Sequence, residues 1–207
     1  MINIDKSGLV GKGLHRECYR HPQNKNLCIK VIVAGDGKVN ARKESEREKK
    51  YYRHLEKRGI CWDMIPMYYG DIETNLGLGF VFDLIVDEDG APSKSLEYYL
   101  SSDEETEAHY ESLSNSLYLL KDYIFQQRII TMTLQPKNIL CQKSKSEINR
   151  LFIADNIGNS DLIPICNYSK YFAQKKMSRK WQRFVDSILN TYEPNKALHR
   201  VLTSSHR

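Results

Sequence analysis

The character of this chain changes at one point, the polar, turn-forming stretch DEDGAP at residues 87–92. Before it, strand-like runs such as LCIKVIV (residues 27–33) and GFVFDLIVD surround one charged helical segment. After it, good helix formers predominate, with apolar residues at helical spacing. A β-rich front with one helix and a mostly helical back predict an α+β fold. We expect one domain over residues 1–207 with two lobes, residues 1–88 and 89–207.

The front lobe begins with LVGKGLHRECYRHP, which predicts a strand, a glycine turn and a second strand. The strand at residues 27–33 is closed by the turn residues GDGK. Residues 40–58 lack proline and glycine and are rich in helix formers, so they predict a helix. Gly59 follows as its stop.

In the back lobe Ser95 is suited to cap a short helix, SLEYYL. Asp103 opens a longer helix whose apolar positions lie at helical spacing; these are Leu113, Leu117, Leu120 and Ile124. The runs RIITMTL, NILC and LFIAD predict short buried strands or an extended loop. Residues 169–189 predict an amphipathic basic helix.

Composition favours an ordinary globular protein, with 41% apolar and 28% charged residues and no apolar run near the ~18–20 residues of a membrane span. We do not expect the N-terminal residues to act as a secretion signal, since they lack a basic stretch followed by an apolar one. The five cysteines are scattered and never spaced C-x-x-C, which favours free thiols over a zinc site and predicts a cytoplasmic location. A net charge of +5 suits an anionic ligand such as a nucleotide and is too small to require nucleic acid.

Several residues are candidates for phosphate chemistry, and each has an ordinary alternative. The glycines of G-K-G, Gly11 and Gly13, can bind phosphates through backbone N–H groups or can form a plain hairpin turn. The ammonium group of Lys30 can contact the phosphates or can point into solvent. Glu48 can pair with Lys30 and hold it, or can be one more solvent-facing charge on its helix.

Two further candidates lie in the back lobe. Asn138 is a metal ligand or a turn former, and Asp155 follows an apolar run where a carboxylate needs a metal or backbone donors. The segment between them predicts a hairpin that returns Asp155 close to Asn138, so that both oxygens share one Mg²⁺. Glycine turn, strand Lys, helix Glu, loop Asn and strand-end Asp follow the order of the protein-kinase signature set.

The chain also resembles a known family. Stretches such as GLHRECYRHP, LCIKVI, YYGDIET, FVFDLIVDEDGAPS, TMTLQPKNILC and ADNIGNSDLIP resemble the small bacterial YrbL proteins. That family is placed in the PhoP regulatory network and in the protein-kinase-like superfamily. The resemblance covers nearly the whole chain, and it implies a minimal bilobal protein-kinase-like fold.

One element of the kinase signature is missing. In TMTLQPKN the catalytic Asp is replaced by Thr133, and the usual neighbouring Lys by Gln135. A threonine is not a useful proton acceptor near pH 7, and losing a general base costs on the order of 10²–10⁴ in rate. After Asp155 the Phe of D-F-G is also absent. Only 49 residues follow Gly158, so we do not expect the activation loop and helical platform that dock peptides.

Two functions follow from these patterns. The first is ATP and Mg²⁺ binding with weak or atypical phosphotransfer to an unknown acceptor or a regulatory protein. In it Gly11, Gly13 and Lys30 contact the nucleotide, Asn138 and Asp155 hold Mg²⁺, and Lys30, Glu48 and Asp155 form the catalytic set. The alternative is a non-catalytic module that binds a protein or nucleic-acid partner through the basic C-terminal helix, although nucleic acid is not the partner we expect.

Overall fold

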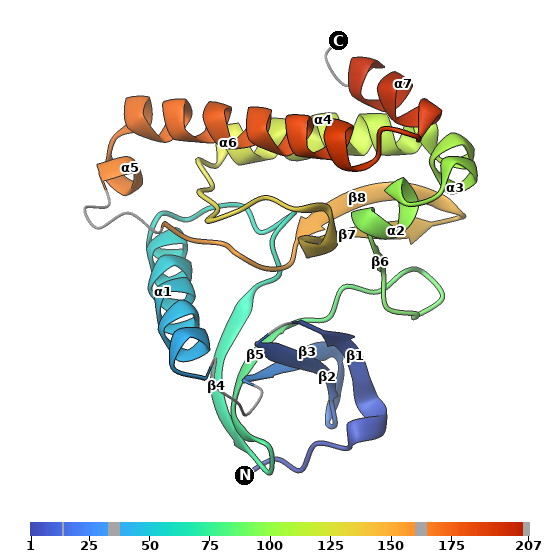
Figure 1. Ribbon diagram of the computed structural model, residues 1–207. Helices are drawn as coiled ribbons and strands as arrows, with labels where there is room; N and C mark the ends of the chain where they lie inside the picture. Colours follow the sequence, from blue (N-terminus) through green and yellow to red (C-terminus); the bar gives the residue numbers. More distant parts are fainter. Residues whose placement is uncertain (14, 33–37, 160–164, 205–207) are drawn as a thin grey trace. The chain divides into compact units, whose positions relative to one another are not determined.

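The computed structural model describes residues 1–13, 15–32, 38–159 and 165–204, and it divides into two compact units (Figure 1). Unit 1 comprises Met1–Trp62 and Pro66–Ile85. Unit 2 comprises Asp63–Ile65 and Val86–Arg207. Unit 1 is rich in strands and unit 2 is mostly helical, which confirms the predicted α+β class.

Unit 1 contains one antiparallel sheet with the strand order β1-β2-β3-β5-β4. Its elements are the 3₁₀ turn η1 (Lys6–Gly8), β1 (Leu9–Lys12), β2 (Arg16–His21), β3 (Asn24–Ile32), α1 (Lys38–Lys57), β4 (Tyr68–Thr74) and β5 (Gly77–Asp83). The expected strand, glycine turn and strand at the start of the chain are confirmed. Residues 33–37, which include most of the expected GDGK turn, lie outside the described residues.

The two faces of β3 carry different chemistry because successive side chains of a strand alternate. Ile29 and Val31 join a buried cluster with Ile4, Tyr19 and Val81 on one face. Lys30 lies on the other face, which places a cation on the side of the sheet opposite this cluster.

Helix α1 ends as its sequence predicts. Gly59 has a φ of 63°, a left-handed conformation that glycine adopts without the steric cost of a Cβ atom. Its N–H donates to the carbonyl of Glu56 at 2.9 Å, which satisfies one of the last carbonyls of the helix. On the buried side of α1, the ring of Tyr52 lies 5.5 Å from that of Phe82 in β5.

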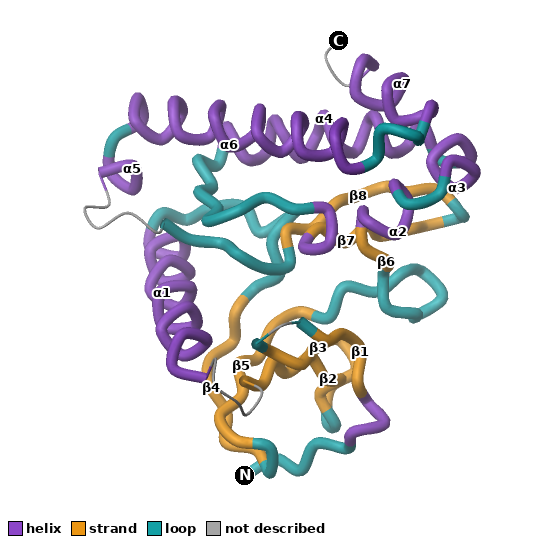
Figure 2. Tube along the Cα trace, viewed as in Figure 1, coloured by secondary structure: helices purple, strands orange, loops and turns teal. Residues whose placement is uncertain are grey.

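Unit 2 contains a three-stranded sheet in the order β6-β7-β8, with helices around it. Its elements are β6 (Lys94–Ser95), α2 (Leu96–Leu100), α3 (Asp103–Ala108), α4 (Tyr110–Gln126), the 3₁₀ turn η2 (Pro136–Asn138), β7 (Ile139–Ser144), β8 (Glu147–Ile153), α5 (Ile165–Tyr168), α6 (Lys170–Thr191) and α7 (Lys196–Ser204). Figure 2 shows the connection from α4 to β7 as loop except for η2. The run RIITMTL is therefore an extended loop, the second of the two forms that we expected.

Helix α4 packs against β8, α6 and α7. Its predicted core positions are buried, namely Leu113, Leu117, Leu120 and Ile124. The expectation of one long helix from Asp103 is wrong, because α3 ends at Ala108 and His109 leaves helical geometry with a φ of −116°. The predicted cap is confirmed, since the side chain of Ser95 accepts a hydrogen bond from the N–H of Tyr98.

Candidate functional site

The glycine turn of unit 1 joins β1 to β2. Gly11 is paired with Cys18, and the N–H of Gly13 donates to the carbonyl of Arg16 at 2.8 Å. The N–H of Gly13 therefore closes the hairpin in this structure. The antiparallel pairing of β1 with β2 shows the hairpin, and both glycines are exposed; contact of this turn with phosphates stays a prediction.

Lys30 lies in the middle of the sheet. It is half-buried on β3, opposite Cys18 of β2 and Phe80 of β5. Its ammonium group lies 4.5 Å from the centre of the Phe82 ring, a cation–π contact. The strands on both sides fix the backbone of Lys30, so the sheet defines where this cation can reach.

Glu48 pairs with a residue that the sequence interpretation did not name. Its Oε2 accepts a hydrogen bond from Nη1 of Arg16 at 2.5 Å, and the expected pair with Lys30 stays a prediction. The side chain of Glu48 is only 4% exposed, and its Oε1 is buried without a hydrogen-bond partner among the described residues. Arg16 is the first residue of β2, so this ion pair joins β2 to α1.

The residue after Glu48 fixes α1 to the sheet. Nζ of Lys49 pairs with Asp71 of β4 at 2.8 Å and with Glu46 at 2.6 Å. Burial disfavours the charged form of Lys49, but the hydrogen bonds that Lys49 donates to the two carboxylates outweigh this effect and raise the pKa of the ammonium. Burial likewise acts against the charged Asp71, yet hydrogen bonds from Lys49 and Tyr68 lower its pKa. Helix α1 is thus held in one register, which determines the position of Glu48.

In unit 2 the hairpin of β7 and β8 brings Asn138 and Asp155 to the same end. Ile139 pairs with Ile153, and the N–H of Ala154 donates to the carbonyl of Asn138 at 2.8 Å. Oδ1 of Asp155 accepts from the N–H of Asn156 at 2.8 Å. The hairpin that the sequence predicted between the two metal-ligand candidates is therefore present.

Thr133 is tied to the segment that follows Asp155. Nδ2 of Asn156 donates to Oγ1 of Thr133 at 3.0 Å, and the carbonyl of Asn156 accepts from the N–H of Met132 at 2.8 Å. A single bridge pairs Thr131 with Ile157. Asn156 has a φ of 61°, a conformation that asparagine tolerates better than most residues. These bonds hold the loop with Thr133 beside the metal-ligand candidates.

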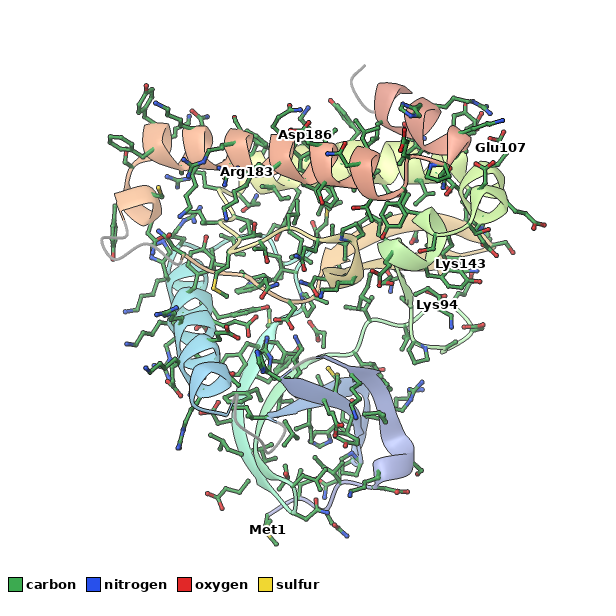
Figure 3. All side chains as sticks on the ribbon, viewed as in Figure 1. Met1, Lys94, Glu107, Lys143, Arg183 and Asp186 are labelled. Atoms are coloured by element: carbon green, nitrogen blue, oxygen red, sulfur yellow. The ribbon has the colours of Figure 1, made fainter. Side chains whose placement is uncertain are left out.

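Two lysines of the basic helix α6 point into unit 2 and form hydrogen bonds there. Lys180 donates to the carbonyl of Met132, and buried Lys176 donates to Oδ1 of Asn159 at 2.6 Å. Trp181 and Phe184 are buried, whereas Tyr171 is 67% exposed. The remaining basic residues lie on the exposed face; they are Lys170, Lys175, Arg179 and Arg183, the last labelled in Figure 3. The basic residues of the predicted amphipathic helix are thus divided between its buried and its exposed faces.

The sequence interpretation missed Arg16, Asn156 and Lys180. Arg16 had a readable signal, because it occupies the position of the third glycine in a G-x-G-x-x-G pattern that starts at Gly11. Asn156 and Lys180 act through hydrogen bonds to residues 23 and 48 positions away, which a pattern of neighbouring residues does not reveal.

The residues present fit Mg²⁺ better than a transition metal. No group of three or more His, Cys, Asp or Glu side chains suited to a metal occurs among the described residues. Mg²⁺ is commonly bound by one or two protein oxygens together with phosphate oxygens of the substrate. The amide of Asn138 and the carboxylate of Asp155 can supply the protein oxygens. Within the described ranges, none of the helices combines the length and apolar character needed to cross a bilayer.

Comparison with solved structures gives the fold. The CAK complex from Chaetomium thermophilum bound to ATP-gamma-S aligns with a TM-score of 0.55 and 17% identity, over 75% of this chain and 47% of that chain. A solved kinase domain also gives a TM-score of 0.55, with 15% identity over 75% of this chain and 51% of its own. The chain spans about half the length of these kinases, and at such identities the likeness shows a kinase-like fold alone.

Comparison with curated sequences gives the family. YrbL of Escherichia coli (strain K12) is 42% identical over 191 residues, which cover 89% of this chain and 87% of the relative. YrbL of Shigella flexneri matches to the same extent. The family described as PhoP regulatory network protein YrbL matches residues 2–189. The chain has a kinase-like fold and belongs to the YrbL family.

Proposed function

We propose that this protein binds ATP with Mg²⁺ and has weak or atypical phosphotransfer activity, as a nucleotide-binding member of a bacterial regulatory network in the cytoplasm. The observation that carries the proposal is the end of the β7–β8 hairpin. Asn138 and Asp155 lie there together, and the hydroxyl of Thr133 is hydrogen-bonded to the residue after Asp155. The chain therefore retains two candidate metal-binding oxygens, on Asn138 and Asp155. At the position of the carboxylate that accepts a proton in a kinase, it has Thr133 instead.

The nucleotide-binding half of the proposal rests on residue chemistry and on fold. In unit 1, Lys30 and the turn of Gly11 and Gly13 are the candidates for contact with phosphates. In unit 2, Asn138 and Asp155 are the candidates for Mg²⁺. A bound Mg²⁺ would supply neutralisation of phosphate charge. One solved structure with this fold is named as bound to ATP-gamma-S, which supports the same ligand class here.

The weak-transfer half follows from the groups near Thr133. A hydroxyl does not accept a proton usefully near neutral pH, and its neighbour Asn156 is a neutral amide. Asp155 is a poor substitute base, because a carboxylate that holds a metal has little proton affinity left. Binding can therefore be retained while transfer is slowed on the order of 10²–10⁴.

Calorimetric titration of ATP with and without Mg²⁺ tests the proposal. The parent protein should bind ATP more tightly with Mg²⁺, and Asp155→Ala should lose that dependence. Asp122→Ala is a matched control, because Asp122 lies on α4 and is exposed. The metal assignment would be contradicted if the ATP affinity of the parent did not depend on Mg²⁺. It would also be contradicted if Asp155→Ala kept the same Mg²⁺ dependence as the parent.

A second candidate function is supported by the exposed part of α6. Four basic side chains and the exposed rings of Tyr171 and Phe172 lie on this helix, which suits an acidic protein or a single-stranded nucleic acid. Truncation is a poor test, since Trp181 and Phe184 belong to the core. Exchanging Lys175, Arg179 and Arg183 for Glu should abolish anisotropy-detected binding to fluorescent polyglutamate or RNA. Unchanged binding in the charge-exchanged variant, or none in the parent, would exclude this function.

A further inference from the structure

Two of the cysteines lie together on the sheet of unit 1. Cys18 of β2 pairs with Lys30 of β3, and Cys28 stands two residues before Lys30 on the same strand. Side chains directly opposite each other share a face of the sheet, and so do residues two apart on one strand. Cys18 and Cys28 are therefore diagonal neighbours on the face that carries Lys30.

The two thiols are in contact with each other. The side chains of Cys18 and Cys28 share a hydrogen bond. Sγ of Cys28 also donates to the carbonyl of Asp83 at 3.5 Å, which helps to hold this sulfur in place. A disulfide requires two Cβ atoms on the same side of the backbone, with their side chains directed toward each other. A pair of thiols that share a hydrogen bond on one face of a sheet meets this requirement.

The two sulfurs differ in their surroundings. Cys28 is buried, whereas Cys18 is partly exposed. On the other side of β2, Cys18 pairs with Gly11, and a Cβ atom added to Gly11 would lie 3.8 Å from the Cβ of Cys18. Because glycine has no side chain, the residue opposite Cys18 on β1 does not cover this cysteine. A small reagent therefore reaches Cys18 more easily than Cys28.

The protonation of Cys28 points to the same order of reaction. Its hydrogen bond with Cys18, together with burial, raises the pKa of Cys28, so this thiol is protonated near neutral pH. Oxidants react with the thiolate form, and mainly with exposed cysteines. We therefore expect the first oxidation on Cys18, with Cys28 beside it as the second thiol.

We infer that Cys18 and Cys28 form a redox-active pair, which hydrogen peroxide converts to an intramolecular disulfide. The sulfur of Cys18 attacks one peroxide oxygen, the O–O bond breaks, and the other oxygen leaves with the thiol proton as water, so that Cys18 becomes a sulfenic acid. The sulfur of Cys28 then attacks the sulfenic sulfur, and the hydroxyl group leaves with the proton of Cys28 as a second water. The two sulfurs lose two electrons, and one peroxide is reduced to two waters.

The disulfide would join β2 to β3 beside Lys30. Disulfides of proteins in reducing compartments are commonly transient and redox-sensing, which fits a pair of thiols with one exposed member. The inference goes beyond the proposed function and does not depend on ATP binding.

The test is oxidation of the folded protein with hydrogen peroxide, followed by alkylation in denaturant and mass spectrometry. Trypsin cleaves after Lys and Arg, so Cys18 and Cys28 fall in separate peptides, ECYR (residues 17–20) and NLCIK (residues 26–30). The intact protein should lose two hydrogen masses and two of its five alkylatable thiols. The two peptides should appear as one linked species, which dithiothreitol separates.

Matched variants show whether this pair is responsible. Cys18→Ser and Cys28→Ser should each abolish the linked species, and circular dichroism verifies that they fold. Cys61→Ser is the control, because Cys61 is exposed and belongs to the same unit, and it should form the linked species as the parent does. Oxidation of the parent in concentrated urea should give a smaller share of this disulfide, because the unfolded chain does not hold the two thiols together.

Three results would overturn the inference. The first is a folded parent in which Cys61 is oxidised while the two peptides stay separate. The second is oxidation of Cys18 to a sulfinic acid without a link to Cys28. The third is an equal share of the disulfide in the folded and the unfolded parent, which would show that the sheet does not position the pair.

Discussion

Nδ2 of Asn156 donates a hydrogen bond to Oγ1 of Thr133 at 3.0 Å. The pair joins the loop at the expected position of a kinase base to the segment directly after Asp155. Thr133 therefore uses its oxygen as an acceptor for a neutral amide, and no proton-accepting group occupies its position.

Restoring a carboxylate at this position should raise phosphotransfer. In Thr133→Asp the new oxygen can keep the bond from Asn156 and also accept a proton, so ATP turnover should rise by roughly tenfold or more. Thr133→Asn is the matched control, because it has the same shape without the charge. Turnover is measured by release of ADP in a coupled assay. Equal rates in the two variants would show that the missing base is not what limits the reaction.

Breaking the pair between Arg16 and Glu48 should destabilise unit 1. Arg16→Ala leaves a buried carboxylate without its cation, which costs about 3 kcal/mol or more. Adding Glu48→Gln should recover a large part of that loss, because the amide carries no charge. Urea denaturation gives both free energies of unfolding. If the double variant is no more stable than Arg16→Ala, the pair is not the cause of the loss.

The contact between Lys49 and Asp71 should make stability depend on pH in the acid range. The pKa of Asp71 is lowered in the folded protein, so its carboxylate adds stability above its unfolded pKa of about 3.9, and this is lost as the pH falls through the folded pKa. Asp71→Asn should therefore be less stable than the parent near pH 6 and lose less stability on acidification. Urea midpoints from pH 6 downward measure the difference. A gap between the two proteins that stays constant down to pH 2.5 would contradict the assignment.

Lys180 should be needed for order in the loop of Thr133. Its ammonium binds the carbonyl of Met132, so Lys180→Met should speed hydrogen exchange of the Met132 amide, which donates to Asn156. Lys175→Met is the control, since Lys175 lies on the same helix and is exposed. Exchange followed by NMR or mass spectrometry tests this. Equal protection of the Met132 amide in both variants would show that the loop does not depend on Lys180.

The sequence predicted the features that depend on local patterns. The cap at Ser95, the stop at Gly59 and the buried stripe of Leu113 and Leu117 follow from propensity and periodicity. The break at His109 was not predicted, because the residues on both sides favour a helix and no Pro or Gly marks the interruption.

At the candidate site, local features could likewise be predicted from the sequence, whereas contacts between distant residues could not. The hairpin that returns Asp155 to Asn138 is a local event with a readable turn. The pair between Arg16 and Glu48 depends on strand register and on side-chain reach between β2 and α1, which no window of neighbouring residues contains.

Thermal unfolding with and without ATP and Mg²⁺ tests the central claim most directly, on the parent and on Lys30→Ala and Asp155→Ala. A ligand at 100 times its Kd adds about 2.7 kcal/mol, which should raise the Tm of a domain of this size by roughly 5–11 °C. The proposed function predicts a Mg²⁺-dependent rise of that order in the parent, which both Lys30→Ala and Asp155→Ala should lose. No rise in the parent at any workable concentration would contradict nucleotide binding.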